Sequence, residues 1–577
     1  MPGESATMDT PQTGADQLIH RLVEEGVEFI FGYPGGAIMP VYDALYRARD
    51  RIRHVLVRHE QGACHAAQGY ARSTGKTGVC LVTSGPGAGN LITGMADALA
   101  DSTPLLCICG QVSSGQLGSD AFQETDTIGL SLAASKWSYQ IIRAGDAGPA
   151  VTRALQIATN GRPGPVLLDF TRDAQLAAPE ANHRDPQDPL ESDTTFCWQP
   201  RQPREDLRAL ADAAELINGA RKPLLLLGHG VSLSGAESQA RQLAETAGIP
   251  TAATLLGLSA MPDCHPLYTG MLGMHGHYAP NRLTNSADVI IAVGMRFDDR
   301  VTGRLDAYAR QARIIHIDID AAEINRHVPA QVALIGDAKM VLEQLLPLIQ
   351  PRRHSGWLAQ FQHYRKIEQQ QVIDPELTPA SAQLHMGEVL DSLSRQTRGE
   401  AIIVSDVGQH QMMAARYYRF AKPASHITSG GLGTMGFAIP AAIGATLGQP
   451  QRPVIAIAGD GGAQMTVQEL GTVMQEHIPL KLIILNNQHL GMVRQWQDLF
   501  FDQRYSQVSL ESPDFVALAR SYRIDAQCVQ EREDLEAAIA TMLSHCGAYV
   551  LEIRVVKEDN IFPMIASGAS VSEIRLS

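Results

Sequence analysis

Two short motifs in the last third of the chain carry residues that suit a divalent cation. Gly459-Asp460-Gly461-Gly462 follows the apolar run 454–458, and Asn486-Asn487 follows a second apolar run, 480–485. Continuous apolar runs of this length are typical of buried parallel strands. Because neighbouring parallel strands end at the same edge of a sheet, we expect Asp460 and Asn487 to converge. A carboxylate and an amide oxygen beside a glycine-rich turn suit Mg²⁺ and a diphosphate.

A glutamate in the first part of the chain could supply acid–base chemistry. Residues 54–58 alternate as a strand does, and Glu60 follows in the sequence Arg58-His59-Glu60-Gln61-Gly62. Small residues open the next helical run, and a carboxylic acid beside small apolar walls is expected to be poorly solvated and to hold a proton near neutrality. The alternative is an exposed glutamate at the end of a strand.

Two further glycine-rich turns could point backbone N–H groups at a ligand. Gly35-Gly36-Ala37 precedes a helical run and could face a developing oxyanion or a substrate. Residues 83–90 (TSGPGAGN) form a second strand-to-helix turn, which alone is a weak phosphate signal. Asp318 ends the apolar run 314–319 and could bond a ribose hydroxyl, although no strict GxGxxG precedes it.

The elements that must position these residues fall into three α/β blocks. Strand-like and helix-like runs alternate over 11–180, 206–350 and 380–555, which predicts three doubly wound parallel-sheet domains. Within the third block, residues 464–476 have a helical pattern. The polar stretch 179–205 has no period and is expected to be a linker, and 352–379 is a second polar connector that closes the second block. Residues 556–577 form a C-terminal tail.

Length and composition exclude several classes of protein. A chain of 577 residues is too long for one hydrophobic core, and 45% hydrophobic with 19% charged residues is typical of a soluble globular protein. The net charge of −14 argues against a nucleic-acid partner, and no apolar run approaches the roughly 20 residues that cross a membrane. The eight cysteines form neither a disulfide framework nor a zinc pattern. Without a secretory signal at the N-terminus, we expect a cytoplasmic enzyme of bacterial type.

The spacing of the first two motifs resembles a known family signature. Gly-Asp-Gly followed after about 25 residues by Asn-Asn resembles the pattern shared by thiamine-diphosphate enzymes. The resemblance implies that Asp460, the Asn487 side chain and the backbone carbonyl of His489 hold the Mg²⁺ that anchors the cofactor. It also implies that Glu60 bonds the pyrimidine N1′ of the cofactor and so promotes removal of the thiazolium C2 proton.

Segments spread over nearly the whole chain are similar to the catalytic large subunit of acetohydroxyacid synthases. They are 31–37 (FGYPGGA), 58–62 (RHEQG), 84–87 (SGPG), 120–124 (DAFQE), 161–165 (GRPGP) and 430–436 (GGLGTMG). This family of transferases decarboxylates pyruvate on thiamine diphosphate and condenses the hydroxyethyl carbanion with pyruvate or 2-ketobutyrate. The products, 2-acetolactate and 2-aceto-2-hydroxybutyrate, lead to valine, leucine and isoleucine. The resemblance also implies pyrimidine-binding, FAD-binding and diphosphate-binding domains, in that order, with a flavin that does no net redox work.

Individual catalytic roles follow from the same resemblance. Met435 matches the bulky residue that bends the cofactor into a V shape, which makes proton transfer intramolecular. Arg300 suits a 2-ketoacid carboxylate, and Met492 and Trp496 share a helix face that contacts the second substrate. Trp496 is expected to favour 2-ketobutyrate over pyruvate by about 1–3 kcal/mol. Gly36 and Gln123 complete the expected catalytic group.

The remaining cofactor contacts are also implied by the resemblance. Beside Glu60, Met435, Asp460, Asn487 and Met492, the residues expected at thiamine diphosphate are Pro34, Gly85, Asn90, Gln409, His410, Gly433, Gly459, Gly461 and Gly462. Those expected at FAD are Arg162, Gly228, Gly230, Thr254, Leu255, Met274, His275, Gly294, Arg296, Asp318, Ile319 and Asp337.

The family arrangement implies partners as well. Because Glu60 and Asp460 belong to different domains, it places the site at a subunit interface, so a homodimer or a dimer of dimers is expected, with a small regulatory subunit. Two alternatives share the cofactor, a pyruvate oxidase and a flavin-free catabolic acetolactate synthase, and residues 296–300 (RFDDR) and Trp496 weigh against both. An alternative of another class is a non-catalytic nucleotide-sensing α/β protein.

Overall fold

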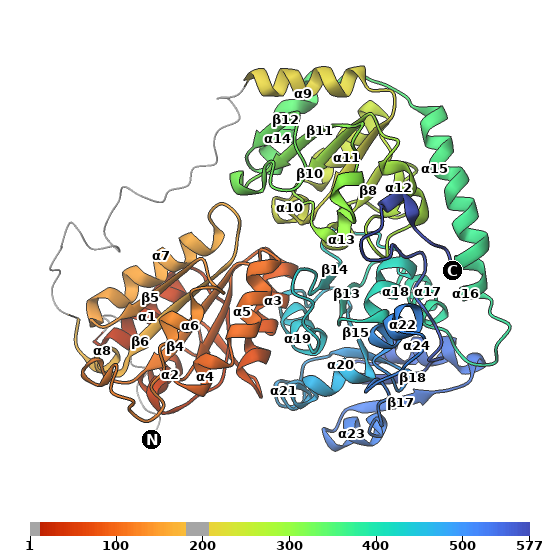
Figure 1. The fold of residues 1–577 in the computed structure, drawn as a ribbon. Helices are drawn as coiled ribbons and strands as arrows, with labels where there is room; N and C mark the ends of the chain where they lie inside the picture. The colour runs from red at the N-terminus through yellow and green to blue at the C-terminus, as the bar shows by residue number, and fades with distance from the viewer. Residues whose placement is uncertain (1–11, 180–206) are drawn as a thin grey trace. The chain divides into compact units, whose positions relative to one another are not determined.

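The computed structural model describes residues 12–179 and 207–577, and Figure 1 shows their fold. The linker predicted at 179–205 lies outside the described residues from position 180 onward. Three six-stranded sheets, parallel at every pairing of their strands, carry helices on their faces, which confirms the predicted α/β class. The chain divides into two compact units, one with the first sheet together with Gly431–Gln451 and Met465–Leu480, the other with the second and third sheets.

The first sheet has the strand order β2-β1-β3-β4-β6-β5. Its strands are β1 Phe29–Gly32, β2 Arg53–Leu56, β3 Gly78–Val82, β4 Leu105–Gln111, β5 Trp137–Ile141 and β6 Pro165–Thr171. The helices of this unit are α1 Gly14–Glu24, α2 Met39–Arg47, α3 Glu60–Thr74, α4 Pro86–Gly89, α5 Ile92–Ala100, α6 Thr127–Ser131, α7 Ala147–Thr159, α8 Arg172–Leu176, α19 Ala438–Gly448 and α21 Leu470–Glu476. Strands β3, β4 and β6 are buried along their whole length, as their continuous apolar sequences predict.

Helices α3 and α19 pack closely because both carry glycines at the crossing. A Cβ added to Gly69 would lie 1.8 Å from the carbonyl oxygen of Ala441, and one added to Gly444 would lie 1.8 Å from that of Ala66. Only glycine permits so close an approach of two helix backbones. Helix α3 begins at Glu60, so this packing fixes the helix that carries the predicted acid.

The second sheet has the order β12-β11-β10-β7-β8-β9. Its strands are β7 Pro223–Leu227, β8 Thr251–Ala253, β9 Tyr268–Met271, β10 Val289–Val293, β11 Arg313–Asp318 and β12 Val332–Ile335. Its helices are α9 Leu207–Gly219, α10 His229–Leu233, α11 Glu237–Ala247, α12 Tyr278–Thr284, α13 Asp299–Thr302 and α14 Ala338–Leu345.

The third sheet has the order β14-β13-β15-β16-β18-β17, so β15 and β16 lie side by side. Its strands are β13 Ile402–Ser405, β14 His426–Thr428, β15 Val454–Gly459, β16 Lys481–Asn486, β17 Asp525–Val529 and β18 Tyr549–Arg554. Its helices are α17 Met386–Thr397, α18 Gln409–Tyr417, α20 Asp460–Met465, α22 Gly491–Phe500, α23 Phe515–Ser521 and α24 Leu535–Ser544.

Two segments differ in local structure from what their sequences suggest. The stretch 352–379, expected to be a polar connector, is largely helical and forms α15 Ser355–Glu368, a π-helical turn Gln369–Ile373 and α16 Asp374–Leu377. Trp357 and Phe361 lie one turn apart on α15 and are both buried, which gives this polar sequence an apolar face. The helix expected over 464–476 is broken into α20, the 3₁₀ turn Val467–Glu469 and α21.

The C-terminal tail is folded onto the second unit. It forms isolated bridges between Gly303 and Ser570 and between Met564 and Arg575, and Ile561 is fully buried. Among the described residues, no helix is long and apolar enough to cross a membrane.

Candidate active site

Asp460 and Asn487 follow the ends of two adjacent strands, as the sequence predicts. Gly459, the last residue of β15, is in register with Leu485 of β16, so the two strands end at the same edge of the sheet. Asp460 and Asn487 are 1% and 7% exposed. The Asn487 Oδ1 accepts a hydrogen bond from the backbone N–H of His489 at 3.0 Å. The three candidate metal ligands therefore come from one buried corner of the third sheet.

The Asp460 carboxylate has one side-chain partner, which the sequence analysis missed. Ser512 donates its hydroxyl hydrogen to Asp460 Oδ2 at 2.6 Å from a loop 52 residues further along the chain. Burial raises the pKa of Asp460 above its usual value, and the bond from Ser512 opposes that rise. The charge of Arg554 also opposes the rise, but burial outweighs it, so this position favours binding of a further positive charge.

Residues around this corner include a buried polar atom without a partner and two glycines that pack against polar side chains. The His410 ring is buried, burial lowers the pKa of His410 to about 4, and its Nε2 is without a hydrogen-bond partner among the described residues. A Cβ on Gly459 would lie 2.9 Å from His410 Nδ1, and one on Gly462 would lie 2.8 Å from Asp406 Oδ1. These orphaned and glycine-lined positions fit a Mg²⁺–diphosphate group, and the predicted Gly461 lies between them in the first turn of α20.

Gln409 connects this corner to a neighbouring helix and to the tail. Its Oε1 lies 3.5 Å from Asn487 Nδ2, and its Nε2 donates to Gln495 Oε1 at 3.1 Å and to the backbone carbonyl of Asp559 at 2.5 Å. Gln495 is fully buried on α22. Asp559 and Gln495 were not predicted, because nothing in their local sequence signals the contact.

The helix α22 carries the residues predicted to select the second substrate. Met492 is half-buried and packs against the core of the second unit. Trp496 is also half-buried, and its ring meets the edge of Phe500 at a centroid distance of 5.9 Å. Nearby, a cavity of about 420 Å³ is lined by His489, Arg494, Tyr505, Gln507, Val508, Ser509, Lys557 and Glu558.

In the first unit, the predicted acid begins helix α3. Glu60 Oε2 accepts a hydrogen bond from Asn90 Nδ2 at 2.9 Å, so two residues of separate motifs come together. The Glu60 side chain is half-exposed in this chain, whereas the sequence led us to expect poor solvation. The difference arises because Glu60 and Gln61 stand at the very start of α3 and are partly exposed, whereas residues 62–71 are buried.

The glycine-rich turns of the first unit lie close to Glu60. Gly85 has a φ of 55°, and a Cβ there would lie 2.9 Å from the carbonyl oxygen of Gln123. A Cβ on Gly87 would lie 3.5 Å from Glu60 Oε1, and one on Gly35 would lie 2.5 Å from Thr83. Glu60, Asn90, Gly85 and Gln123 therefore form one cluster. Pro34 and Gly36 follow β1 in the turn before α2, and the Cβ position of Gly36 faces open space.

A buried glutamate that the sequence analysis missed supports the turn before Glu60. Glu469 accepts the backbone N–H of Arg58 at 3.0 Å and the hydroxyl hydrogen of Thr472 at 2.7 Å. Burial raises the pKa of Glu469 to about 7. Arg58 is 411 positions away in the sequence, so only the fold could show this contact.

Met435 lies in a loop that is held by helix α5 of the same unit. Thr434 donates its hydroxyl hydrogen to Asp97 Oδ1 at 2.8 Å, and the backbone N–H of Gly431 donates to Asp101 Oδ1 at 2.6 Å. Gly433 has a φ of 75°, which favours glycine. The loop is thus fixed on the N-terminal side of Met435, which is half-buried.

In the second sheet, three predicted flavin contacts meet at the ends of β7 and β10. The backbone N–H of Gly230 donates to the carbonyl of Gly294 at 3.0 Å, and a Cβ on Gly228 would lie 2.1 Å from the same oxygen. Gly294 has a φ of 60°. The glycines let the two backbone turns pack directly against each other at this sheet edge, where dinucleotide folds place their ligand.

Other predicted flavin contacts surround the same sheet edge. Asp318 ends β11 and accepts the backbone N–H of Asp320 at 2.9 Å, with Ile319 between them. Asp337 caps α14 by accepting the N–H of Met340 at 3.1 Å, and Thr254 caps the 3₁₀ turn that contains Leu255. Arg162 belongs to the first unit, where its Nε donates to Ser102 Oγ at 2.9 Å.

Arg300 is exposed and lies against the loop that contains Met274 and His275. Its Nη1 is 3.3 Å from Met274 Sδ, and its Nε is 3.6 Å from the exposed carboxylate of Asp299. Burial lowers the pKa of His275 to about 3. Arg296 pairs with Asp298 at 3.6 Å. A guanidinium that is 60% exposed is free to bind a carboxylate ligand.

Comparison with known proteins matches all three α/β blocks to one family. Residues 12–130 match the thiamine pyrophosphate (diphosphate) enzyme N-terminal TPP-binding domain, 210–345 the central domain and 406–553 the C-terminal TPP-binding domain. The chain is 45% identical to the acetolactate synthase isozyme 2 large subunit of Escherichia coli (strain K12), covering 97% of this chain and 99% of that protein.

More distant organisms carry similar proteins. An acetolactate synthase of Mycobacterium bovis is 43% identical, covering 98% of this chain and 91% of that protein. The chloroplastic acetolactate synthase 1 of Nicotiana tabacum is 42% identical, covering 98% of this chain and 85% of that protein. With identity at this level over nearly its full length, the chain belongs to the acetolactate synthase large-subunit family of thiamine diphosphate enzymes.

Proposed function

We propose that the corner of the third sheet around Asp460 binds Mg²⁺ and the diphosphate of thiamine diphosphate in an acetolactate synthase. The observation that carries this proposal is a buried carboxylate and a buried amide at the ends of adjacent strands. Asp460, Asn487 and the carbonyl of His489 would supply oxygen ligands, and His410 Nε2 would gain the partner it lacks. Family membership makes the chain a transferase that joins two 2-ketoacids in branched-chain amino-acid synthesis.

The other residues act on the substrates and on the proton at the reacting carbon. Bound thiamine diphosphate would supply an electron sink when pyruvate loses CO₂. Glu60, oriented by Asn90, would hold the proton that controls the cofactor tautomer. Arg300 would hold the carboxylate of the second 2-ketoacid, and Met492 and Trp496 would form an apolar wall that gives 2-ketobutyrate an advantage.

The second sheet is the place proposed for FAD. Gly228, Gly230 and Gly294 would lie against its phosphates or ribose, and Asp318 and Asp337 follow the ends of neighbouring strands where ribose hydroxyls can be bound. The three blocks are proposed as domains 11–180, 206–350 and 380–555 with the tail 556–577, although contacts assign Gly431–Gln451 and Met465–Leu480 to the first unit.

Some relatives are named as large subunits, which supports a small-subunit partner for this chain. A homodimer is proposed as the minimum assembly, because family members place the catalytic glutamate and the metal corner in one site from two chains. We propose a cytoplasmic enzyme.

The direct test is acetolactate formation from pyruvate by the purified protein, with and without thiamine diphosphate, Mg²⁺ and FAD, together with its absorption spectrum. Activity that requires thiamine diphosphate and Mg²⁺ is expected, with a flavin spectrum. Product analysis with mixed pyruvate and 2-ketobutyrate separates this function from a pyruvate oxidase, which would form no 2-aceto-2-hydroxybutyrate. A yellow protein that releases no CO₂ from pyruvate would contradict the proposal.

A further inference from the structure

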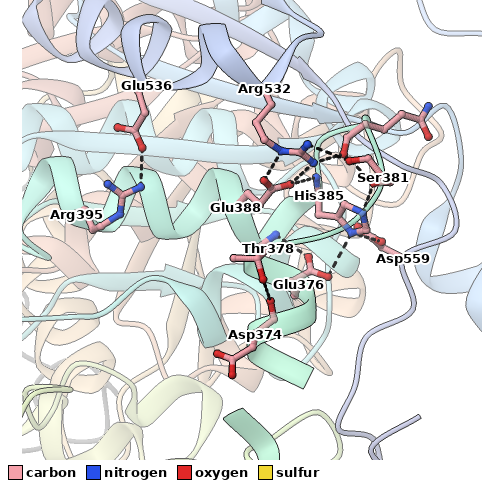
Figure 2. A network of polar contacts seen from close by, with 12 residues as sticks. Asp374, Glu376, Thr378, Ser381, His385, Glu388, Arg395, Arg532, Glu536 and Asp559 are labelled. Carbon is pink, nitrogen blue, oxygen red and sulfur yellow. Dashed lines mark hydrogen bonds and ion pairs between the residues drawn. The ribbon is translucent and has the colours of Figure 1, made fainter. Parts of the chain in front are cut away.

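A cluster of charged side chains joins α16, the start of α17 and the C-terminal tail (Figure 2). His385 Nδ1 lies 2.8 Å from Asp559 Oδ1 and 3.5 Å from Glu376 Oε2. Their side chains are 17%, 8% and 14% exposed, respectively, so the ion pairs are largely shielded from water. Glu376, His385 and Asp559 thus belong to three different segments of the chain.

The surroundings of the ring suit an imidazolium. Ser381 Oγ lies 2.9 Å from His385 Nε2 and donates its own proton to the carbonyl of Gln383 at 3.1 Å, so it can accept from the ring. The two carboxylates, Asp559 first and then Glu376, raise the pKa of His385 to about 10. The ring therefore carries its charge throughout the neutral range.

Hydrogen bonds and an ion pair fix the segment that contains His385. The backbone N–H of His385 donates to Glu388 Oε2 at 3.0 Å, and Arg532 pairs with Glu388 at 2.7 Å. Arg532 also donates to the carbonyls of Ser381 and Gln383 at 3.0 and 2.8 Å (Figure 2). His385 therefore has a fixed position, and the tail binds to it through Asp559.

The opposite side of Asp559 faces the proposed cofactor corner. Its backbone carbonyl accepts the hydrogen bond from Gln409 Nε2 at 2.5 Å, and Gln409 Oε1 lies 3.5 Å from Asn487 Nδ2. The next residues of the tail bind α22, because Asn560 Nδ2 donates to Asp498 at 2.8 Å and the Ile561 N–H donates to Gln495 Oε1 at 2.8 Å. Asp559 therefore links His385 to Gln409, and the Gln409 side chain contacts Asn487, a proposed metal ligand.

We propose that His385 is a positioning residue that, by pairing with Asp559, holds the Gln409 carboxamide in place beside Asn487 and so tightens the Mg²⁺–thiamine diphosphate site. The inference rests on the proposed cofactor site. Its effect belongs to cofactor affinity and not to the chemical step, because the cluster reaches the site only through Gln409.

The test compares three variants with the wild-type protein by their half-saturating concentrations of Mg²⁺ and thiamine diphosphate in acetolactate formation. His385→Gln and Asp559→Asn are each expected to raise both values about 10-fold, the range found when outer partners of metal ligands are removed. At saturating cofactor, kcat and the KM for pyruvate should stay within about twofold. The double variant should be no worse than either single one, since both break the same contact.

Two further measurements separate positioning from a loss of folding. His385→Lys retains a positive charge between the carboxylates and is expected to recover most of the cofactor affinity. Arg395→Gln is the matched control, because Arg395 lies on the same helix and pairs with exposed Glu536 without touching the tail (Figure 2). Limited proteolysis should cleave the tail of His385→Gln faster than that of Arg395→Gln, and added cofactor should reduce this difference.

The inference would be overturned if His385→Gln left the half-saturating concentrations of Mg²⁺ and thiamine diphosphate unchanged, or if Arg395→Gln changed them equally. The wild-type protein would still be active in either case. Absence of any cofactor-dependent activity in the wild-type protein would instead reject the proposed function. A stoichiometric transition metal that is lost in His385→Gln would also overturn the inference, since a cation and not a proton would then join the three side chains.

Discussion

The edges of the first and third sheets treat their functional carboxylates in opposite ways. Asp460 is 1% exposed, burial raises its pKa, and a single hydroxyl is its side-chain partner. Glu60 is half-exposed and held by the amide of Asn90, while a buried acid of its unit, Glu469, supports the turn before it. The proposed metal corner thus buries a carboxylate whose charge a cation would balance, whereas Glu60, the proposed acid, is a positioned carboxylate that a ligand could reach.

The largest effect is expected from Asp460→Asn, which removes the buried charge. Losing a first metal ligand takes away several kcal/mol of interaction with the cation, so acetolactate formation should fall by at least about 10³-fold at ordinary Mg²⁺ concentrations. Initial rates over a wide Mg²⁺ range measure this loss. Asp502→Asn, at an exposed ion pair with Arg504, is the control and should be near wild type. Retained activity in Asp460→Asn would place the metal elsewhere.

Glu60→Gln tests the other edge and should leave cofactor binding intact. The amide still bonds Asn90 but cannot exchange a proton, so exchange of the thiazolium C2 proton should slow by about 10²–10⁴-fold. NMR of C2 deuterium exchange on the bound cofactor measures the rate, and fluorescence quenching measures binding. Near-normal exchange would reject the assigned role, and weakened binding with normal exchange would make Glu60 a binding residue only.

The strand ends that carry Asp460 and Asn487 could be predicted from sequence, but the exposure of Glu60 and the supporting contacts could not. Strands β15 and β16 form where the apolar runs 454–458 and 480–485 predict them, and Asp460 and Asn487 follow their ends as their motifs predict. Ser512 and Glu469 escaped prediction because each acts on a residue at least 52 positions away, and no local pattern records such a contact. Helix α15 was missed because its polar residues outnumber the two buried aromatic residues of its packed face.

Trp496→Leu tests whether helix α22, beside the proposed metal corner, also selects the second substrate. Loss of the indole should remove an apolar contact with the extra methylene of 2-ketobutyrate and lower its preference over pyruvate by about 10- to 200-fold. Competition between the two 2-ketoacids, with both products quantified, measures the ratio. Phe500→Leu is the matched control, because it removes only the ring that Trp496 contacts. Equal loss in both variants would indicate packing within α22 as the cause.

Ser512→Ala tests whether the hydrogen bond from Ser512 orients Asp460 for metal binding. Without the hydroxyl, the carboxylate loses its side-chain hydrogen bond and its orientation, so half-saturating Mg²⁺ should rise about 10-fold with kcat little changed. Ser509→Ala, in the same loop, is the control. A fall in kcat without a change in Mg²⁺ dependence would show that Ser512 acts on another step.

The smallest effect is expected from Glu469→Gln, and it depends on pH. Because burial raises the pKa of Glu469 from its usual 4.5 to about 7, the folded chain binds this proton more tightly than the unfolded chain. The resulting stabilisation is complete below about pH 4.5 and is lost as pH rises through 7. Glutamine mimics the protonated acid, so the variant should gain a few degrees of melting temperature over wild type at pH 8 and little at pH 5. Glu511→Gln, at an exposed position, should show no such trend, and a difference independent of pH in Glu469→Gln would mean that Glu469 titrates as an ordinary carboxylate.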